Sequence, residues 1–93
     1  MIKYTPERSV KFRKDYRRMK KRGYNMSLLD NVITRLANGE PLPPRYEDHP
    51  LKGNRKGYRG CHILPDWVLI YKIDKGNLIL ILTETGSHAD LLE

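Results

Sequence analysis

The chain has 93 residues, and its 18 Lys and Arg against 11 Asp and Glu leave a formal net charge of +7. That length predicts one domain over residues 1–93, and the basic surface favours phosphate-rich or acidic partners. A single cysteine, Cys61, excludes a disulfide framework and is expected to pack as a small hydrophobe. With no apolar run near the ~18 residues of a membrane helix and no secretory signal, we expect a cytoplasmic protein without a membrane partner.

The first third of the chain predicts a strand and then a basic helix. Residues 2–5 alternate in polarity as a short strand does, and Thr5 before Pro6 is a candidate N-cap. A helix over residues 7–22 would place Phe12, Tyr16 and Met19 on one apolar face, flanked by Val10, and Gly23 would end it.

A second helix is predicted to begin at Ser27, as N-cap, and to end at Asn38-Gly39, with apolar residues at helical spacing between them. The two helices would form a hairpin, which needs another layer to bury its apolar faces. Residues 40–54 contain four prolines and are expected to form a loop without regular structure.

The second half predicts three strands, Gly57–Leu64, Trp67–Ile73 and Leu78–Thr83, separated by short turns. Short connections imply an antiparallel meander, and the last strand should be central because it is apolar on both faces. Ser87 reads as the N-cap of a final helical turn over residues 88–92. The expected fold class is therefore α+β: a short N-terminal strand, a two-helix hairpin, a three-stranded meander and a short C-terminal turn.

All three histidines of the chain, His49, His62 and His88, lie in this second half, near loops and strand ends. A lone histidine in such a position is more often structural than catalytic, but three together raise the odds of a shared site. Arg59 would face away from His62 in a regular strand, and a bulge near Gly60 could bring the two together.

Metal-free RNA cleavage needs residues of the types found here. RNA supplies its own nucleophile, the 2′-hydroxyl, and the enzyme adds a base, an acid and cations. Histidine suits both proton roles because its ordinary pKa is about 6.5, and Asp66 could orient a histidine or act as base. Trp67 and Tyr58 could stack bases, although either could equally pack in the core. The candidate cations are Lys52, Arg55, Lys56 and Arg59.

A zinc or iron site formed by the histidines and Asp66 is the alternative interpretation. The spacings match no short metal-binding motif, and the surrounding cations would repel a divalent ion. We therefore expect no metal and no other cofactor.

The run YEDHPLKGN-x-KGYR-x-CHI-x-PDWVLIY, followed by TGSHADLL, resembles the YafQ-type branch of the RelE/ParE superfamily of bacterial toxins. The similarity covers most of the chain and is strongest over residues 46–92. It implies a RelE-like fold and the toxin of a type II toxin–antitoxin pair. Such toxins cut messenger RNA in the ribosomal A site without a metal, and a cognate antitoxin neutralises them. The antitoxin usually carries the DNA-binding segment, so contact with operator DNA would be indirect.

By motif position, the resemblance implies catalytic roles for His49, His62, Asp66 and His88. It also implies RNA contacts by the basic loop around Lys52 and Lys56, with Trp67 beside the catalytic set.

Three positions depart from the family pattern. Glu84 stands where the family commonly has an arginine that stabilises the phosphate charge, Gly60 where it often has Asp or Glu, and Leu92 where it has an aromatic residue. These changes predict weakened or rearranged catalysis, with Arg59 as a substitute cation.

Two functions follow from the sequence. The first is a ribosome-dependent mRNA endonuclease. The second is a catalytically weakened toxin fold that binds its antitoxin and acts in operon regulation. Gyrase poisoning, known from the ParE branch, is a more remote option because that branch lacks this set of histidines.

Overall fold

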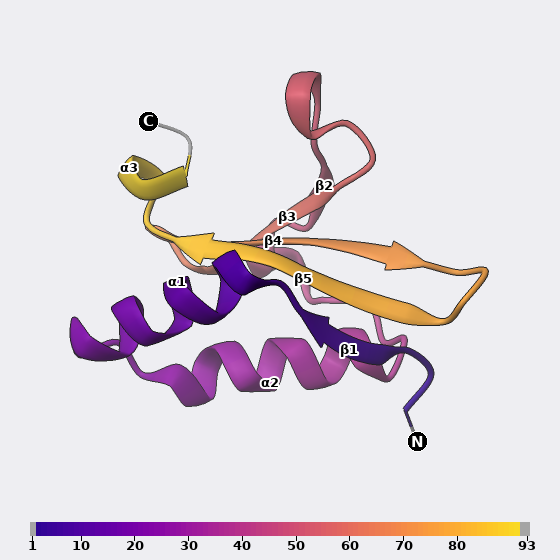
Figure 1. Cartoon of the computed structure of the whole chain (residues 1–93), viewed down its shortest axis with the longest axis horizontal. Coiled ribbons are helices and arrows are strands. Elements are labelled where there is room, and N and C mark those ends of the chain that lie inside the picture. The colour runs from indigo at the N-terminus through magenta and orange to yellow at the C-terminus, as the bar shows by residue number, and fades with distance from the viewer. Residues whose placement is uncertain (1, 92–93) are drawn as a thin grey trace.

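The computed structural model describes residues 2–91. The helices and strands follow in the order β1 (Thr5–Arg8), α1 (Val10–Lys21), α2 (Met26–Ala37), β2 (His49–Pro50), β3 (Arg59–Leu64), β4 (Trp67–Asp74), β5 (Ile79–Gly86) and α3 (His88–Leu91), with 3-10 turns η1 (Pro44–Tyr46) and η2 (Gly53–Arg55) before and after β2 (Figure 1). None of the helices in the described part of the chain is long and apolar enough to cross a membrane.

A five-stranded sheet in the order β1-β5-β4-β3-β2 forms the centre of the molecule. β3, β4 and β5 pair antiparallel, which confirms the predicted meander and the α+β class, while β1 pairs parallel to β5. β5 therefore lies inside the sheet, as its apolar sequence predicts.

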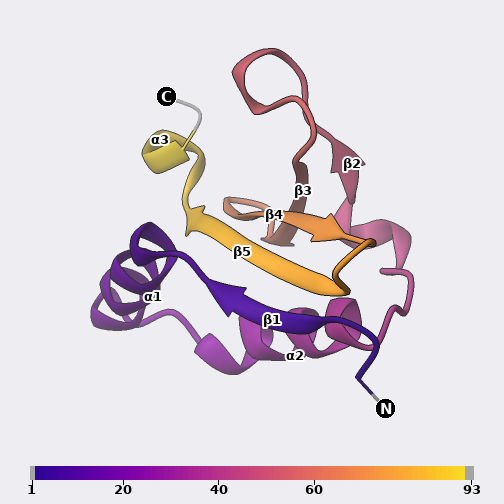
Figure 2. The same cartoon turned by 45° about the vertical axis from the view of Figure 1, so that its right-hand side comes forward.

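The two faces of the sheet have different covers. α1 and α2 lie against one face, here called the helix face, whereas α3 and the loop of residues 51–58 lie on the other, here called the open face (Figures 1 and 2). Because successive strand residues alternate in direction, Trp67, Leu69 and Tyr71 join the main core under the helices. Val68 and Ile70 face the other way and form a smaller cluster with Leu91.

The N-terminal strand and the first helix begin later than predicted. The backbone of Thr5 donates to Leu78 O and that of Ser9 to Leu82 O, so residues 5–8 pair with β5 instead of starting a helix. The helix N-cap is Ser9, whose hydroxyl accepts from Phe12 N and donates to Thr83 O, and the prediction of Thr5 was wrong. Val10 is 70% exposed and does not extend the apolar face.

The N-cap of α2 is Asn25, so the prediction of Ser27 was also wrong. The Asn25 side chain accepts from the Ser27 backbone N at 3.1 Å and from the Ser27 hydroxyl at 2.6 Å. Asn25 lies just before the helix and so accepts from a free amide of its first turn, whereas Ser27 already lies inside that turn.

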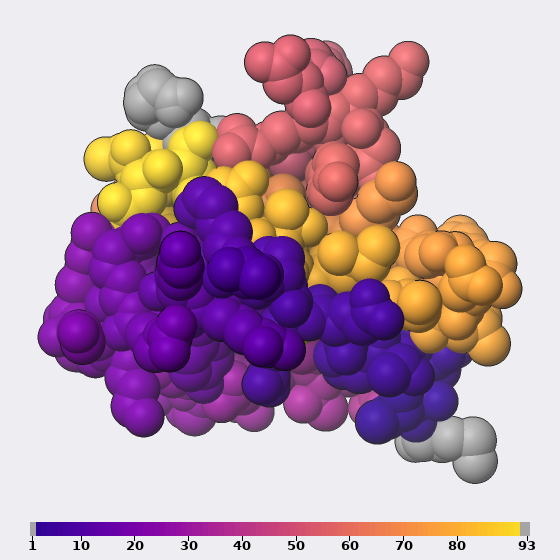
Figure 3. Space-filling model, in the orientation of Figure 1, coloured from indigo at the N-terminus to yellow at the C-terminus, as the bar shows by residue number. Residues whose placement is uncertain are grey.

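The loop of residues 40–54 is more ordered than its prolines suggest. It contains both 3-10 turns and the two-residue strand β2, which pairs His49 with Gly60 and Pro50 with Arg59. The prediction of a loop without regular structure was therefore wrong at these residues. Proline is tolerated here because β2 is an edge strand. The following residues 51–58 protrude from the body of the molecule (Figure 3).

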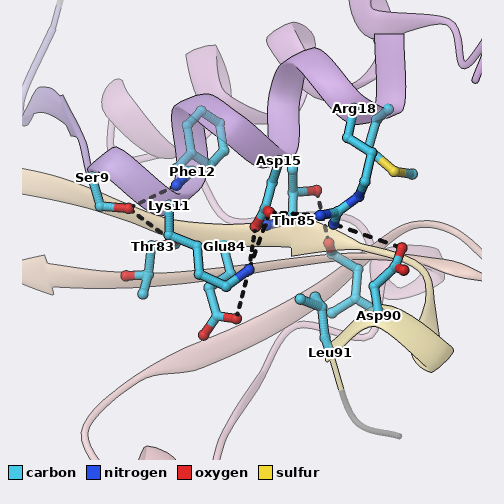
Figure 4. Close-up of polar contacts among 12 residues, drawn as sticks. Ser9, Lys11, Phe12, Asp15, Arg18, Thr83, Glu84, Thr85, Asp90 and Leu91 are labelled. Carbon is cyan, nitrogen blue, oxygen red and sulfur yellow. Dashed lines mark hydrogen bonds and ion pairs between the residues drawn. The ribbon is translucent and has the colours of Figure 1, made fainter. Parts of the chain in front are cut away.

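Asp15 is the buried charged side chain of the helix face, with 1% of its surface exposed. Its carboxylate accepts from the Thr85 backbone N at 3.2 Å and forms ion pairs with Lys11 at 3.0 Å and Arg18 at 3.2 Å (Figure 4). These contacts tie the middle of α1 to the end of β5.

We expect Asp15→Ala to lower the free energy of unfolding by about 2–3 kcal/mol, because it leaves the buried Thr85 amide without an acceptor. Chemical denaturation followed by circular dichroism measures the change. The control Asp30→Ala removes a carboxylate that accepts from the Tyr16 hydroxyl at the exposed surface and should cost about 1 kcal/mol or less. Equal losses in the two variants would contradict the anchoring role of Asp15.

Candidate active site

His62 and His88 face each other on the open face of the sheet. His62 in β3 pairs with Val68 in β4, which pairs with Gly86 in β5, so the three residues form one row across the sheet. His88 begins α3 two residues after Gly86. The ring centroids of His62 and His88 are 5.2 Å apart, so the structure brings together two of the three predicted histidines directly.

Asp66 holds His88 from the turn between β3 and β4. Its carboxylate accepts from the His88 ring Nδ1 at 3.2 Å and from the His88 backbone N at 3.4 Å. The neighbouring Trp67 fixes this turn, because its indole N–H donates to the buried hydroxyl of Thr85 at 2.9 Å. The PDW and TGSH segments are thus joined by the Asp66–His88 contact and, beside it, by the Trp67–Thr85 hydrogen bond.

His49 joins the group through Glu47, a residue that sequence reasoning missed. The His49 ring Nδ1 donates to the Glu47 carbonyl at 2.6 Å, and Glu47 Oε1 lies 3.8 Å from His62 Nε2. Glu47 has a φ of 48°, the left-handed conformation that is uncommon outside glycine and often marks functional sites. The signal in the sequence was an acidic residue two positions before a loop histidine, which is too common to stand out.

In all three histidines, the ring nitrogen Nδ1 is the one that contacts a protein oxygen. Each Nδ1 lies against an oxygen: the Glu47 carbonyl for His49, the Pro65 carbonyl at 3.2 Å for His62, and the Asp66 carboxylate for His88. Oxygen acceptors assign the proton to Nδ1. Nε2 of each ring is then the nitrogen that can accept or deliver a proton.

α3, which carries His88, is fastened to the C-terminal end of α1. Asp90 pairs with Arg22 at 2.8 Å and accepts from the Ser87 backbone N at 3.0 Å. The hydrogen bond from Arg22 holds the pKa of Asp90 well below its ordinary value. Gly86 permits this close packing, because a Cβ at that position would lie 2.9 Å from the Asp90 Cβ.

The predicted cations occupy different environments. Lys52 and Lys56 are exposed on the protruding loop. Arg55 reaches back from this loop and donates to Glu84 at 3.1 Å and to the Leu91 carbonyl at 3.1 Å. The loop therefore presents two open cations and is held by a third.

Arg59 does not join His62. It pairs with Asp48 at 3.2 Å, and the irregularity in β3 falls between His62 and Leu64, not at Gly60. The expected bulge at Gly60 was wrong because Gly60 pairs regularly with Ile70. Asp48 also accepts from the Tyr71 hydroxyl at 2.6 Å, and burial together with this bond raises the pKa of Tyr71.

Trp67 is fully buried in the main core, where Tyr24 packs edge-on against it at 5.0 Å. It has no open face for a base, so we correct the expectation of RNA stacking: Trp67 positions Asp66 from within the core. Tyr58 is half-buried with Lys72 over its ring at 5.4 Å. Cys61 is buried as predicted, and burial raises the pKa of its thiol to about 12.

Two departures from the family pattern have visible consequences on the open face. A Cβ at Gly60 would lie 3.2 Å from Leu51 Cδ2 and 3.8 Å from His49 Cε1, so a larger side chain there would press on Leu51 and lie beside the His49 ring. Glu84 is paired with Arg55 at 3.1 Å and approaches Lys11 at 3.6 Å, so two cations balance its charge. Leu92, the third departure, lies outside the described residues.

The described residues 2–91 contain no group of three or more His, Cys, Asp or Glu side chains placed to hold a metal ion. The arrangement of the site is that of two facing imidazoles, a carboxylate that orients one of them, a third imidazole linked through Glu47, and a basic loop beside them.

Comparison with known proteins finds one family of bacterial toxins. The family model described as "Bacterial toxin of type II toxin-antitoxin system, YafQ" matches residues 4–93. The mRNA interferase toxin YafQ of Escherichia coli K12 is 45% identical over 93 residues, which cover 98% of each chain.

Solved structures agree over the whole chain. The toxin of the E. coli DinJ–YafQ toxin–antitoxin complex superposes with a TM-score of 0.89 at 42% identity, covering 99% of this chain and 100% of that one. A metal-bound toxin from Helicobacter pylori superposes with a TM-score of 0.89 at 45% identity, covering 98% and 99%.

The Asp90 contacts predict a pH-dependent stability. Because the folded chain lowers this pKa, the contribution of Asp90 is complete above the ordinary Asp value of about 3.9 and is lost as the pH falls toward the depressed value. We expect wild type to exceed Asp90→Asn in free energy of unfolding at pH 6, with the difference shrinking below about pH 4. Denaturation series at several pH values measure it. The control Glu7→Gln, an exposed carboxylate of β1, should show no such convergence.

Proposed function

The chain belongs to the YafQ family of bacterial toxins from type II toxin–antitoxin systems, and on this basis we propose that it cuts messenger RNA on the ribosome without a metal ion. The observation that carries this proposal is the facing pair of His62 and His88, 5.2 Å apart, with Asp66 attached to His88. Two imidazoles at this separation suit a reaction in which one group takes a proton and another returns one.

The reaction uses the 2′-hydroxyl of the RNA as its nucleophile. One imidazole accepts the 2′-hydroxyl proton, the oxygen attacks the adjacent phosphorus, and the bond to the 5′-oxygen breaks as a second imidazole protonates it. His62 and His88 supply these two roles through Nε2. Asp66 fixes the orientation of His88, and His49 completes the proton-transfer set.

The basic loop holds the RNA backbone in this proposal. Lys52 and Lys56 are exposed on the protruding loop and contact phosphates, and Arg55 adds a cation between α3 and β5. Negative charge builds up on the non-bridging phosphate oxygens in the transition state, so preorganised cations lower the barrier. Arg59 is paired with Asp48 and contributes by holding the base of the loop.

A cognate antitoxin is the proposed protein partner, with operator DNA bound indirectly through it. The E. coli relative is seen in complex with DinJ. In this chain, α1 exposes Arg13, Lys14 and Arg17 and so offers a basic surface to an acidic antitoxin segment.

We expect His62→Gln and His88→Gln each to lower the rate of mRNA cleavage in a translation reaction by roughly 10²–10⁴-fold, the usual worth of a general acid or base. Asp66→Asn should lower it less, because the amide still orients His88. Induced wild type should arrest growth, and co-expressed antitoxin should restore it. Cleavage products mapped by primer extension measure the effect.

Glu7→Gln is the matched control for Asp66→Asn, since it alters an exposed carboxylate on β1 and should leave cleavage unchanged. Because a Helicobacter relative is metal-bound, the wild-type reaction is repeated with a chelator that spares ribosomal magnesium. Intact transcripts and unimpeded growth with soluble wild type would contradict the nuclease proposal, and loss of cleavage with the chelator would contradict metal independence.

The second candidate is an attenuated toxin fold that binds its antitoxin and acts in operon regulation. Glu84 favours this second candidate, because a carboxylate near the scissile phosphate would repel the phosphate. The contacts of Glu84 with Arg55 and Lys11 favour the active enzyme instead, since they neutralise that charge and fasten the loop.

Glu84→Arg separates the two candidates. For an active enzyme we expect equal or lower toxicity, because the new cation lies beside Arg55 and Lys11 and releases the loop. Growth after induction at matched protein levels measures it, with Glu84→Gln as the control that removes charge without adding a cation. A gain of about tenfold or more in Glu84→Arg over Glu84→Gln would favour the weakened module.

A further inference from the structure

A hollow of about 630 Å³ lies between α2, the η1 turn and the second half of β3. Its size falls within the ~300–1,000 Å³ of small-ligand pockets. β2 pairs with only the first two residues of β3, so the edge of β3 beyond Gly60 faces this space. His62 and Glu47 of the candidate site belong to its lining, whereas Leu28, Arg45, Tyr46, Ile63, Leu64 and Pro65 have no role assigned so far.

The hollow opens directly beside the proposed reaction centre. The ring of His62 contributes to its lining and is also 5.2 Å from His88. An RNA whose phosphate lies between the two rings therefore has one of its neighbouring nucleotides at the mouth of the hollow.

The walls suit a flat aromatic ligand. Leu28, Leu64 and Pro65 give apolar surface, and Leu64 is 43% exposed although it is large and hydrophobic. Arg45 and Tyr46 also line the hollow, where the Arg45 guanidinium lies over the Tyr46 ring at 4.9 Å and donates to the Tyr46 hydroxyl at 2.9 Å. This contact holds a planar cation at the wall, and nucleobases stack on guanidinium and aromatic planes.

The polar group at the mouth sets a preference among bases. Glu47 contributes a carboxylate to the lining, and a carboxylate accepts hydrogen bonds without donating any. Adenine, cytosine and guanine carry an exocyclic amino group that donates, whereas uracil lacks one and offers only its ring N3–H.

We propose that this hollow binds the nucleobase of a nucleotide next to the scissile phosphate and prefers bases with an exocyclic amino group. The inference rests on the proposed RNA substrate and adds a site for base selection to it. Arg45, held over the Tyr46 ring, stacks the base, Leu64 and Pro65 enclose it, and Glu47 selects its edge.

Titration of the isotope-labelled protein with nucleoside monophosphates tests this site without requiring cleavage. We expect millimolar adenosine, cytidine or guanosine 5′-monophosphate to shift the amide resonances of Tyr46, Ile63 and Leu64, and uridine 5′-monophosphate to bind more weakly. Ribose 5-phosphate is the probe for phosphate alone. Equal shifts with ribose 5-phosphate, or no shifts at these residues, would overturn the proposal.

Arg45→Ala should weaken binding of the preferred mononucleotides by about fivefold or more, as expected for lost base stacking. Arg35→Ala removes an exposed arginine from the last turn of α2, outside the hollow, and serves as the matched control. Because Arg45 is exposed, the variant should fold, and its spectrum reports this directly. Equal affinity in the two variants would count against stacking by Arg45.

The cleavage pattern provides a second readout. In translated mRNA, Arg45→Ala should flatten the nucleotide preference beside the cut site while some cleavage persists. Base-dependent shifts in a wild-type protein that cuts no RNA would uphold the hollow and reject the nuclease. Cleavage without base-dependent shifts, and with an unchanged site preference in Arg45→Ala, would reject the hollow and leave the nuclease standing.

Discussion

Thr85 connects three elements that are distant in sequence, and the geometry of the site depends on this connection. Its backbone amide donates to Asp15 of α1, while its hydroxyl accepts from Trp67 and donates to the Val68 carbonyl of β4. The residue is fully buried, so each of these bonds is made away from water, where an unpaired group is costly. Asp66 precedes Trp67 and His88 follows Thr85 by three residues, so the same bonds bring the carboxylate and the imidazole within reach of each other.

Successive residues of each strand point to opposite faces of the sheet, so the core residues and the candidate site residues lie on different faces. Residues facing α1 and α2 form nearly all of the buried core, including Trp67, Leu69 and Tyr71. The opposite face buries only the small cluster around Val68, Ile70 and Leu91, and its remaining surface carries His62, Glu84 and the contacts of α3. Of the residues that the structure describes, only those of the short helix α3 and the loop of residues 51–58 cover the open face, and the incompletely covered face is the one left for a ligand.

Some of the charged side chains form ion pairs around the histidines, and others form exposed basic regions. Asp48, Glu84 and Asp90 each pair with arginine on segments around the histidines, and these pairs fasten the loop and α3. Lys52 and Lys56 stay exposed at the loop, and Arg13, Lys14 and Arg17 along α1. The proposed RNA surface and the proposed antitoxin surface are therefore separate basic regions on opposite sides of the sheet.

Much of the fold could be predicted from the sequence because periodicity and turn residues are local signals: the helical hairpin, the meander and the position of β5 inside the sheet follow from them. The residues of the candidate site were also apparent as types, since three histidines, Asp66 and a basic loop occur together in one half of the chain. Tertiary structure alone decided which of them meet. Because residues 5–8 pair with β5, the N-cap of α1 is Ser9. Trp67 is buried, so it supports the site and cannot stack a base. Arg59 pairs with Asp48 and therefore does not join the histidines. Glu47 entered through a backbone carbonyl and a left-handed turn, which no residue pattern records. Contacts between distant segments depend on strand register and on competition for partners, and neither is written in local sequence.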